Sequence, residues 1–386
     1  MEDRHHGVPL DLNQMVLLLT DTVGLYCGSG QSKRIRLCTR EGRVWCFDKK
    51  QNIAVSPHLD AIDRFIDAAR VVRAARCPGP DHDVHILMYL NALIDFPEFQ
   101  HLHNKTVSDP SLLLSDSAGK PIKLRGNRVF DPRSIKTRQL FVNATLYGMR
   151  SGVFNGVFID RADWASSSKC QWGSCDLVSE CNMAATLCDQ VAVGQRLLLS
   201  ELSAVLGEGN LTLAKETSGA PMIDWQVANA VMTSDTFCSH YCHNCNASVT
   251  PNTTWKHPKD STICANSIEL IYNMSLRGQL SQSHAIGPII NEEARLFTIA
   301  CFLMGAGDLS YFSYANWSID SWELNGTRWW PEYARELGRP TSPGGAGARV
   351  KGKRWKYERS FESGTMIKVD VATRVVEIKW GGGKNQ

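Results

Sequence analysis

Short apolar runs that end at a polar residue alternate along this chain with longer amphipathic stretches. Residues 157–159 form one run and stop at Asp160, and residues 84–90 form another and stop at Asn91. Between positions 59 and 72, apolar residues recur every three to four positions. A compact apolar run is typical of a buried parallel strand, and the three-to-four spacing is typical of an amphipathic helix. The pattern therefore predicts the helix and strand units of an α/β protein.

The same alternation continues toward the C-terminus. We expect helices near 134–149, 184–206 and 289–304, and strands near 210–214, 268–274 and 311–314. Residues 95–128 are a long excursion that suits a surface loop or a small hairpin. After a Gly- and Pro-rich stretch at 340–352, residues 360–380 alternate as strands do around a turn.

Over 386 residues, this pattern favours a TIM-like (β/α)8 barrel over an open sheet. The first strand of the barrel is not recognisable, which leaves open whether the barrel is complete at its N-terminus. We expect three parts: a poorly defined N-terminal segment at 1–55, the barrel at 56–335, and a small C-terminal β appendage at 345–380.

The net charge of +3 gives no basic field that would attract nucleic acid, so no nucleic-acid partner is expected. No apolar run approaches the roughly 20 residues that a bilayer-spanning helix needs, so no membrane span is expected.

Glycosylation triplets and cysteines indicate the compartment. The pattern Asn-x-Ser/Thr begins at Asn104, Asn143, Asn210, Asn246, Asn252, Asn273, Asn316 and Asn325. Of the 13 cysteines, several crowd residues 170–188 and 238–264, which is typical of disulfide-bonded loops. We therefore expect a secreted glycoprotein or one of the endomembrane lumen, although no signal peptide is visible. The alternative is a cytoplasmic protein with reduced thiols.

Two carboxylates follow apolar residues in a similar way. Asp160 ends one run, and Asp224 follows Met222 and Ile223 and precedes a Trp. At the C-terminal ends of barrel strands, such groups face the mouth where substrates bind. Hydrolysis of a glycosidic bond needs two carboxyl groups there, and Trp164 and Tyr89 could stack on sugar rings. The alternative is that each Asp caps a helix or, for Asp160, pairs with Arg161.

Other chemistries find less support. The cysteines and histidines between 238 and 245 have spacing that zinc could use, but a disulfide loop explains them better beside two glycosylation triplets. No Gly-rich phosphate loop and no Gly-x-Ser-x-Gly elbow appears in the expected context. We therefore expect neither a cofactor nor a bound metal.

Several segments, taken in order, resemble hypothetical glycosyl hydrolase family 15. They are HILMYLN at 85–91, LLLSDSAGKP at 112–121, VFD at 129–131, GVFIDR at 156–161, FLMGAG at 302–307, WPEY at 330–333, LGRP at 337–340 and RSFESG at 359–364. The resemblance implies a TIM barrel and a sugar substrate. Related retaining α-glycosidase barrels carry an Asp nucleophile after the fourth strand, which would be Asp160, and an acid/base Asp after the sixth, for which Asp224 is the candidate.

The sequence thus predicts a glycoside hydrolase with Asp160 as nucleophile and Asp224 as general acid/base, and with Glu292 and Glu293 in reserve. The residues expected to position the sugar are Tyr89, Asn91, Arg161, Asp163 and Trp164. The alternative is a catalytically inactive barrel that binds carbohydrate. A metal-dependent hydrolase would need His or Asp ligands at several strand ends, and few are present.

Overall fold

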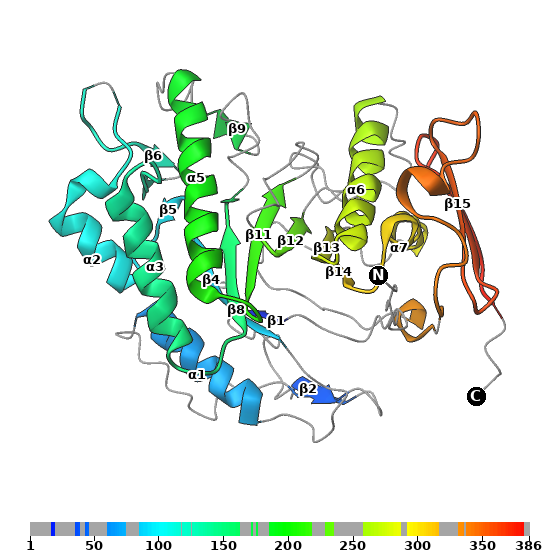
Figure 1. Ribbon diagram of the computed structural model, residues 1–386, viewed down its shortest axis with the longest axis horizontal. Helices are drawn as coiled ribbons and strands as arrows, with labels where there is room; N and C mark the ends of the chain where they lie inside the picture. The colour runs from blue at the N-terminus through cyan, green and yellow to red at the C-terminus, as the bar shows by residue number, and fades with distance from the viewer. Residues whose placement is uncertain are drawn as a thin grey trace, which may run out of the picture. The chain divides into compact units, whose positions relative to one another are not determined.

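A computed structural model gives the fold (Figure 1). It describes residues 17–19, 35–38, 43–45, 60–74, 85–116, 118–124, 126–162, 171–172, 175–176, 185–217, 228–234, 258–286, 292–315, 331–335 and 337–381. The chain divides into two compact units, one of Val16–Val231 and one of Met1–Met15 with Met232–Gln386. The predicted boundaries of the N-terminal segment, the barrel and the C-terminal appendage, at residues 55–56 and 335–345, stay a prediction.

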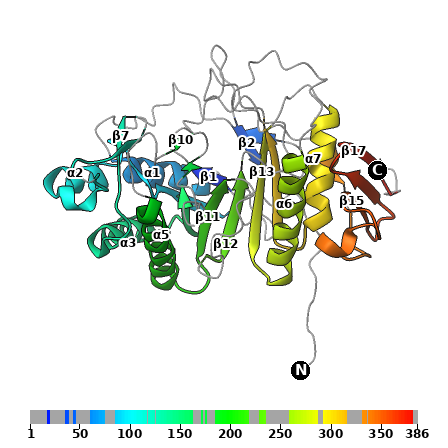
Figure 2. The same ribbon diagram turned by 90° about the horizontal axis from the view of Figure 1, so that it is seen from above.

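A parallel sheet forms the centre of the Val16–Val231 unit. Its strands lie in the order β1 (Leu17–Leu19), β4 (Ile86–Asn91), β8 (Gly156–Asp160) and β11 (Leu211–Thr217), and each neighbouring pair is parallel. The long helices of this unit are α1 (Ala61–Ala74), α3 (Ile135–Met149) and α5 (Ala185–Leu206). Helices α3 and α5 lie side by side, and α5 also packs against β11 (Figures 1 and 2). Helix-to-strand crossovers therefore build this sheet, as the apolar pattern predicts.

The excursion after β4 carries its own small sheet. The elements are β5 (Ile94–Asp95), α2 (Gln100–Ser108), η1 (Pro110–Leu112), β6 (Lys123–Leu124) and β7 (Asn127–Val129). The three strands are antiparallel in the order β5-β7-β6 and cover a separate apolar cluster. Two further antiparallel pairs belong to the unit: β2 (Ile35–Cys38) with β3 (Arg43–Trp45), and β9 (Gln171–Trp172) with β10 (Cys175–Asp176).

The second unit combines a short sheet with two packed helices. Its strands lie in the order β12 (Ala230–Ser234, of which residues 232–234 belong to this unit), β13 (Leu280–Ile286) and β14 (Ser310–Ala315), with β13 and β14 parallel. Helices α6 (Pro258–Leu276) and α7 (Glu292–Gly305) lie side by side (Figure 2). An antiparallel sheet of β15 (Lys356–Ser360), β16 (Met366–Asp370) and β17 (Val375–Lys379) packs on α7. Two short helices are η3 (Pro331–Ala334) and η4 (Gly345–Ala348).

The molecule is a mixed α/β protein with a parallel sheet. Among the strands that the structure describes, neither sheet closes into a barrel, because within each unit no pairing joins its first strand to its last. The prediction of an α/β fold is confirmed. The described strands do not form the closed barrel that the sequence pattern favours. In the described part of the chain, no helix combines the length and the apolar character that crossing a bilayer requires.

One expected strand was wrong. Residues 268–274 belong to helix α6, where Cys264, Ile268 and Ile271 are fully buried. Their spacing of three and four positions places them on one helix face. The first turns of α6 are polar, so the apolar residues between 268 and 274 stand out as a short run when they are taken alone. That short run resembles a strand, although it is the second half of a helix.

Candidate active site

The end of strand β8 brings three polar side chains together. Asp160 is the last residue of β8, whose residues are all buried. Asn91, the last residue of β4, is the direct register partner of Asp160. On the other neighbour, Ala214 pairs with Ile159, so the next residue, Lys215, lies beside Asp160 on β11. Since parallel strands end at the same edge, Asn91, Asp160 and Lys215 share the carboxyl edge of the sheet, where α/β proteins bind their ligands.

Protein groups surround both oxygens of the Asp160 carboxylate. Oδ2 accepts hydrogen bonds from the Tyr89 hydroxyl at 2.9 Å and from Asn91 Nδ2 at 3.2 Å. Oδ1 accepts from the backbone N–H of Arg161 at 3.0 Å and lies 3.4 Å from Lys215 Nζ. Arg161 Nε lies 3.8 Å from Oδ2. A carboxylate with this many donors around it is held in one orientation.

The same contacts set the protonation states. Burial raises the pKa of Asp160, but the charges of Lys215 and Arg161 and the hydrogen bond from Tyr89 outweigh burial and hold the pKa below its ordinary value. Burial, and then the negative charge of Asp160, raises the pKa of Tyr89 well above its ordinary value. Near neutral pH, Asp160 is therefore an anion and Tyr89 a protonated donor.

Asn91 has its amide orientation fixed by the backbone. Its Oδ1 accepts the N–H groups of Leu93 at 3.1 Å and Ile94 at 2.8 Å. Its Nδ2 consequently faces Asp160 and also donates to the Tyr89 hydroxyl oxygen at 3.1 Å. An amide whose oxygen has two backbone donors can present only its N–H groups to the site.

Aromatic side chains pack around Tyr89 and hold its hydroxyl toward Asp160. The ring centroid of Tyr89 lies 5.7 Å from that of Phe158, 6.1 Å from Phe99 and 6.4 Å from Phe65. All four rings are buried. Because aromatic rings at these separations interlock, Tyr89 has little freedom to turn away from the carboxylate.

Four of the predicted site residues come together in the structure: Tyr89, Asn91, Asp160 and Arg161. The other three, Asp163, Trp164 and Asp224, lie outside the described residues. The reserve candidates Glu292 and Glu293 begin α7 in the second unit, and both are exposed. The pairing of Asp160 with a second carboxyl group stays a prediction.

Two residues of the site were missed from the sequence. Lys215 ends an apolar pair, Leu213 and Ala214, in the same way as Asp160 ends its run, and this signal could have identified it. Gln195 lies in the middle of α5 and donates from Nε2 to the carbonyl oxygen of Arg161 at 2.9 Å. No local sequence pattern marks Gln195, because its role depends on how α5 packs against the end of β8.

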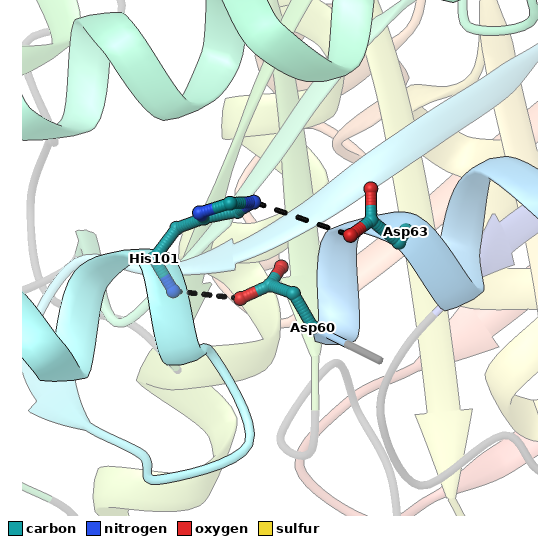
Figure 3. A group of neighbouring side chains, drawn as sticks. All are labelled: Asp60, Asp63 and His101. Atoms are coloured by element: carbon teal, nitrogen blue, oxygen red, sulfur yellow. Dashed lines mark hydrogen bonds and ion pairs between the residues drawn. The ribbon is translucent and has the colours of Figure 1, made fainter. Parts of the chain in front are cut away.

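Asp60, Asp63 and His101 form a second polar group (Figure 3). One ligand atom from each lies within 4.8 Å of the others, which is compatible with a metal ion. However, Asp60 Oδ1 accepts the N–H of Ile62 at 2.7 Å, and Oδ2 accepts the N–H of His101 at 2.8 Å. Both oxygens thus satisfy N–H groups at the starts of α1 and α2, so the group is explained as a joint helix cap.

The chain matches one family model and is similar to several solved structures. The model of hypothetical glycosyl hydrolase family 15 matches residues 81–365. No curated protein matches the chain. Among solved structures, a maltogenic α-amylase from Thermotoga neapolitana is 12% identical over 80% of this chain and 68% of its own, with a TM-score of 0.43.

Two further solved structures are similar over a smaller part of their own length. A dextranase from Flavobacterium johnsoniae is 10% identical over 67% of this chain and 30% of its own, with a TM-score of 0.43. An α-N-acetylgalactosaminidase from Bifidobacterium bifidum is 12% identical over 78% of this chain and 43% of its own, with a TM-score of 0.38. This chain therefore spans less than half of either protein.

The family match covers most of the chain, including β4, β8 and β11. It confirms the resemblance that the sequence segments indicate and fits a carbohydrate as the partner of the site. The chain belongs to hypothetical glycosyl hydrolase family 15.

Proposed function

We propose that this protein is a glycoside hydrolase in which Asp160 is the nucleophile. The observation that carries the proposal is the buried, ionised carboxylate at the carboxyl end of β8, held by Tyr89, Asn91 and Lys215. Family membership supplies the reaction class. A nucleophilic carboxylate must be ionised and fixed in direction, and these contacts provide both conditions.

The proposed reaction proceeds in two steps. An oxygen of Asp160 attacks the anomeric carbon, while a second carboxyl group protonates the leaving oxygen. Water, deprotonated by that second group, then breaks the glycosyl–Asp160 ester and restores the carboxylate. We assign the acid/base role to Asp224, with Glu292 and Glu293 as reserve candidates. The reaction needs the strand ends of a (β/α)8 barrel to converge, so the proposal includes a barrel.

The neighbouring residues have distinct roles in this scheme. Tyr89 and Asn91 hold Oδ2 of Asp160, and Lys215 keeps the carboxylate charged. Arg161, together with Asp163 and Trp164, would position the sugar. Tyr89 and Asn91 would also donate to sugar hydroxyls once a ligand displaces part of the network.

A second candidate function is a catalytically inactive protein that binds carbohydrate. The observation that favours it is the environment of Asp160, because each carboxylate oxygen already has two close protein partners. Such a carboxylate is well stabilised as an anion and is correspondingly less nucleophilic. A binding protein would need Asp160 only to orient the surrounding donors.

A panel of α- and β-linked glycans separates the two functions. Turnover and binding should be recorded for the purified full chain on each glycan. Turnover supports the hydrolase, and the anomer first released identifies the mechanism. Retention requires carboxyl groups about 5–5.5 Å apart, and inversion requires roughly 6.5–9.5 Å. Binding without turnover on every glycan supports the inactive carbohydrate-binding function.

Replacing Lys215 with Met should move the acid limb of the kcat/KM profile to higher pH. The charge of Lys215 lowers the pKa of Asp160, so the pKa rises when the charge is lost. Asp160 must be ionised to attack, so activity then begins to fall at a higher pH as the solution is acidified. The measurement is kcat/KM of wild type and Lys215→Met across the acid range up to neutral pH.

The matched control is Lys215→Arg, which keeps the positive charge and should keep the acid limb close to its wild-type position. The same charge affects stability. A carboxylate with a lowered folded pKa stabilises the fold above its unfolded pKa, and this contribution disappears as pH falls through the folded pKa. Lys215→Met should therefore reduce the difference between the free energy of unfolding at neutral pH and that at acidic pH. An unchanged acid limb would remove Lys215 from the proposed scheme.

We also propose that the protein matures in the secretory pathway or its lumen. Eight Asn-x-Ser/Thr triplets and the crowded cysteines support this. Peptide mass spectrometry of protein expressed in secretory cells should find glycans on several triplets. The same measurement should find cysteine-containing peptides that separate only after reduction. Unmodified triplets and freely alkylated cysteines in that material would contradict the proposal.

A further inference from the structure

The turn after β8 holds Arg161 in a left-handed backbone conformation. Its φ is +62°, and among the described residues only Arg374 is another non-glycine residue with a positive φ. A side chain other than glycine is disfavoured there because Cβ crowds the neighbouring carbonyl. Such a conformation persists only where surrounding contacts impose it, and it is often found at functional sites.

Hydrogen bonds fix this turn on both sides of the strained residue. The carbonyl oxygen of Asp160 accepts the N–H of Ala92 at 3.0 Å. The N–H of Arg161 donates to Asp160 Oδ1 at 3.0 Å, and the carbonyl of Arg161 accepts from Gln195 Nε2 at 2.9 Å. The Gln195 bond thus contributes to holding the far side of the turn, beyond Arg161.

The position of Gln195 is set by a close approach of α5 to the turn before α3. Gln195 is 1% exposed, and the preceding residue, Gly194, lies where an added Cβ would come within 2.6 Å of the backbone of Pro132 and Arg133. Helix α5 can therefore approach the turn before α3 only because residue 194 is glycine. This contact places the Gln195 amide against the turn after β8.

The Gln195 amide is only half satisfied. Its Nε2 donates to Arg161, whereas its buried Oε1 has no hydrogen-bond partner among the residues that the structure describes. Leaving an amide oxygen without a partner in a buried position costs stability. An apolar residue of the same length would avoid this cost, so the presence of Gln195 points to a use for the Nε2 bond.

We infer that Gln195 is a positioning residue for Asp160, because its amide holds the left-handed turn that directs the Arg161 N–H and guanidinium at the carboxylate. The expected effect of Gln195 on kcat rests on the proposed function. The effect of Gln195 on the turn and on the Asp160 carboxylate does not depend on catalysis, so it can be tested without any substrate.

Gln195→Met removes the donor and keeps the length of the side chain. The pKa of Asp160 should rise by about 0.5 or more, because the Arg161 N–H is no longer held at Oδ1. The measurement is a ¹³Cγ NMR titration of the full chain with labelled aspartate, in which Asp160→Asn identifies the signal. Where wild type turns over a glycan, kcat should fall about tenfold or more and KM should change by less than about threefold.

The matched control is Val191→Ala, one helical turn earlier on α5 and also fully buried. It should lower Tm by a few degrees but leave the Asp160 titration and kcat unchanged. In an Arg161→Gly background, glycine adopts the turn unaided, so Gln195→Met should shift the pKa of Asp160 much less than in wild type. If Gln195→Met does not fold, Gln195→Asn keeps the amide, loses its reach and carries the same test.

The outcomes separate the inference from the proposed function. If wild type hydrolyses no glycan but the titration shifts as expected, the proposed function fails and the positioning role stands. If Gln195→Met lowers Tm but leaves the Asp160 titration within error of wild type, Gln195 only stabilises packing and the inference is overturned. An equal shift in the Arg161→Gly background would also overturn it, because the effect would not act through the turn.

Discussion

Asp160→Asn is expected to lower glycan turnover on the order of 10³-fold or more and to leave glycan binding within a few-fold of wild type. The substitution keeps the size and shape of the side chain but removes the charge and the attacking oxygen anion. Turnover and binding should be measured on the same glycan, with product formation followed long enough to detect a residual rate.

Asp160→Asn should also lower Tm, for a reason that is specific to this site. The partners of both carboxylate oxygens are donors: Asn91 Nδ2 and Tyr89 OH on one side, and the Arg161 N–H and Lys215 on the other. An amide N–H at position 160 would face the Arg161 N–H and Lys215 in one orientation and Asn91 Nδ2 in the other, where the Tyr89 hydroxyl oxygen is the one acceptor among these partners. A buried group without a suitable partner costs about 1–3 kcal/mol. Thermal unfolding at neutral pH measures this loss.

Glu208→Gln is the matched control, since it also neutralises one carboxylate of the same unit but lies on an exposed turn after α5. It should leave both turnover and Tm close to wild type. Intact-mass measurement must confirm that the Asp160→Asn protein has not reverted to aspartate by deamidation. Wild-type turnover by a verified Asp160→Asn protein would remove Asp160 as nucleophile and shift attention to another carboxylate.

The predicted part of the site follows from a simple physical rule. Val157, Phe158 and Ile159 are apolar because β8 is buried on both faces, and Asp160 is polar because the strand ends there. Tyr89 and Asn91 follow the same rule on β4. Since neighbouring parallel strands end at one edge, strand ends recognised separately in the sequence meet in space.

The sequence marks Lys215 as the end of an apolar pair, but it cannot place either Lys215 or Gln195 beside Asp160. Identifying Lys215 as a neighbour requires the register of β11 against β8, which aligns Ala214 with Ile159. Identifying Gln195 requires the packing of α5, which depends on Gly194. Both facts are tertiary, and the local apolar pattern contains neither of them.

Strand β13 was missed for a different reason. In β13, Ser281, Gln282 and Ser283 are buried although they are polar. The hydroxyl of Thr233 donates to Ser283 Oγ at 3.2 Å, and that of Ser281 donates to Ser310 Oγ at 3.0 Å. In β13, hydrogen bonds between strands thus replace apolar packing, so a search for apolar runs cannot detect this strand.

Gly156→Ala is expected to destabilise the protein by about 4 kcal/mol or more, or to prevent folding. Gly156 has a φ of +152°, and a Cβ added there would lie 2.0 Å from the carbonyl oxygen and 2.6 Å from the nitrogen of Leu211. Leu211 is the register partner of Gly156 on β11, so the obstacle is backbone and no side chain can rotate away. Relief requires the start of β11 to move from β8. Chemical denaturation followed by circular dichroism measures the loss.

Gly152→Ala is the matched control for backbone strain without a clash. Gly152 has a φ of +71°, and an added Cβ would meet no atom within 4 Å. It should cost only about 1–2 kcal/mol, the typical cost of a non-glycine residue at positive φ. The difference between the two variants therefore measures the close contact of β8 with β11. Equal losses would show that Leu211 can move at little cost. In that case the register that places Lys215 beside Asp160 would be loosely held, and the charge effect argued for Lys215 would weaken with it.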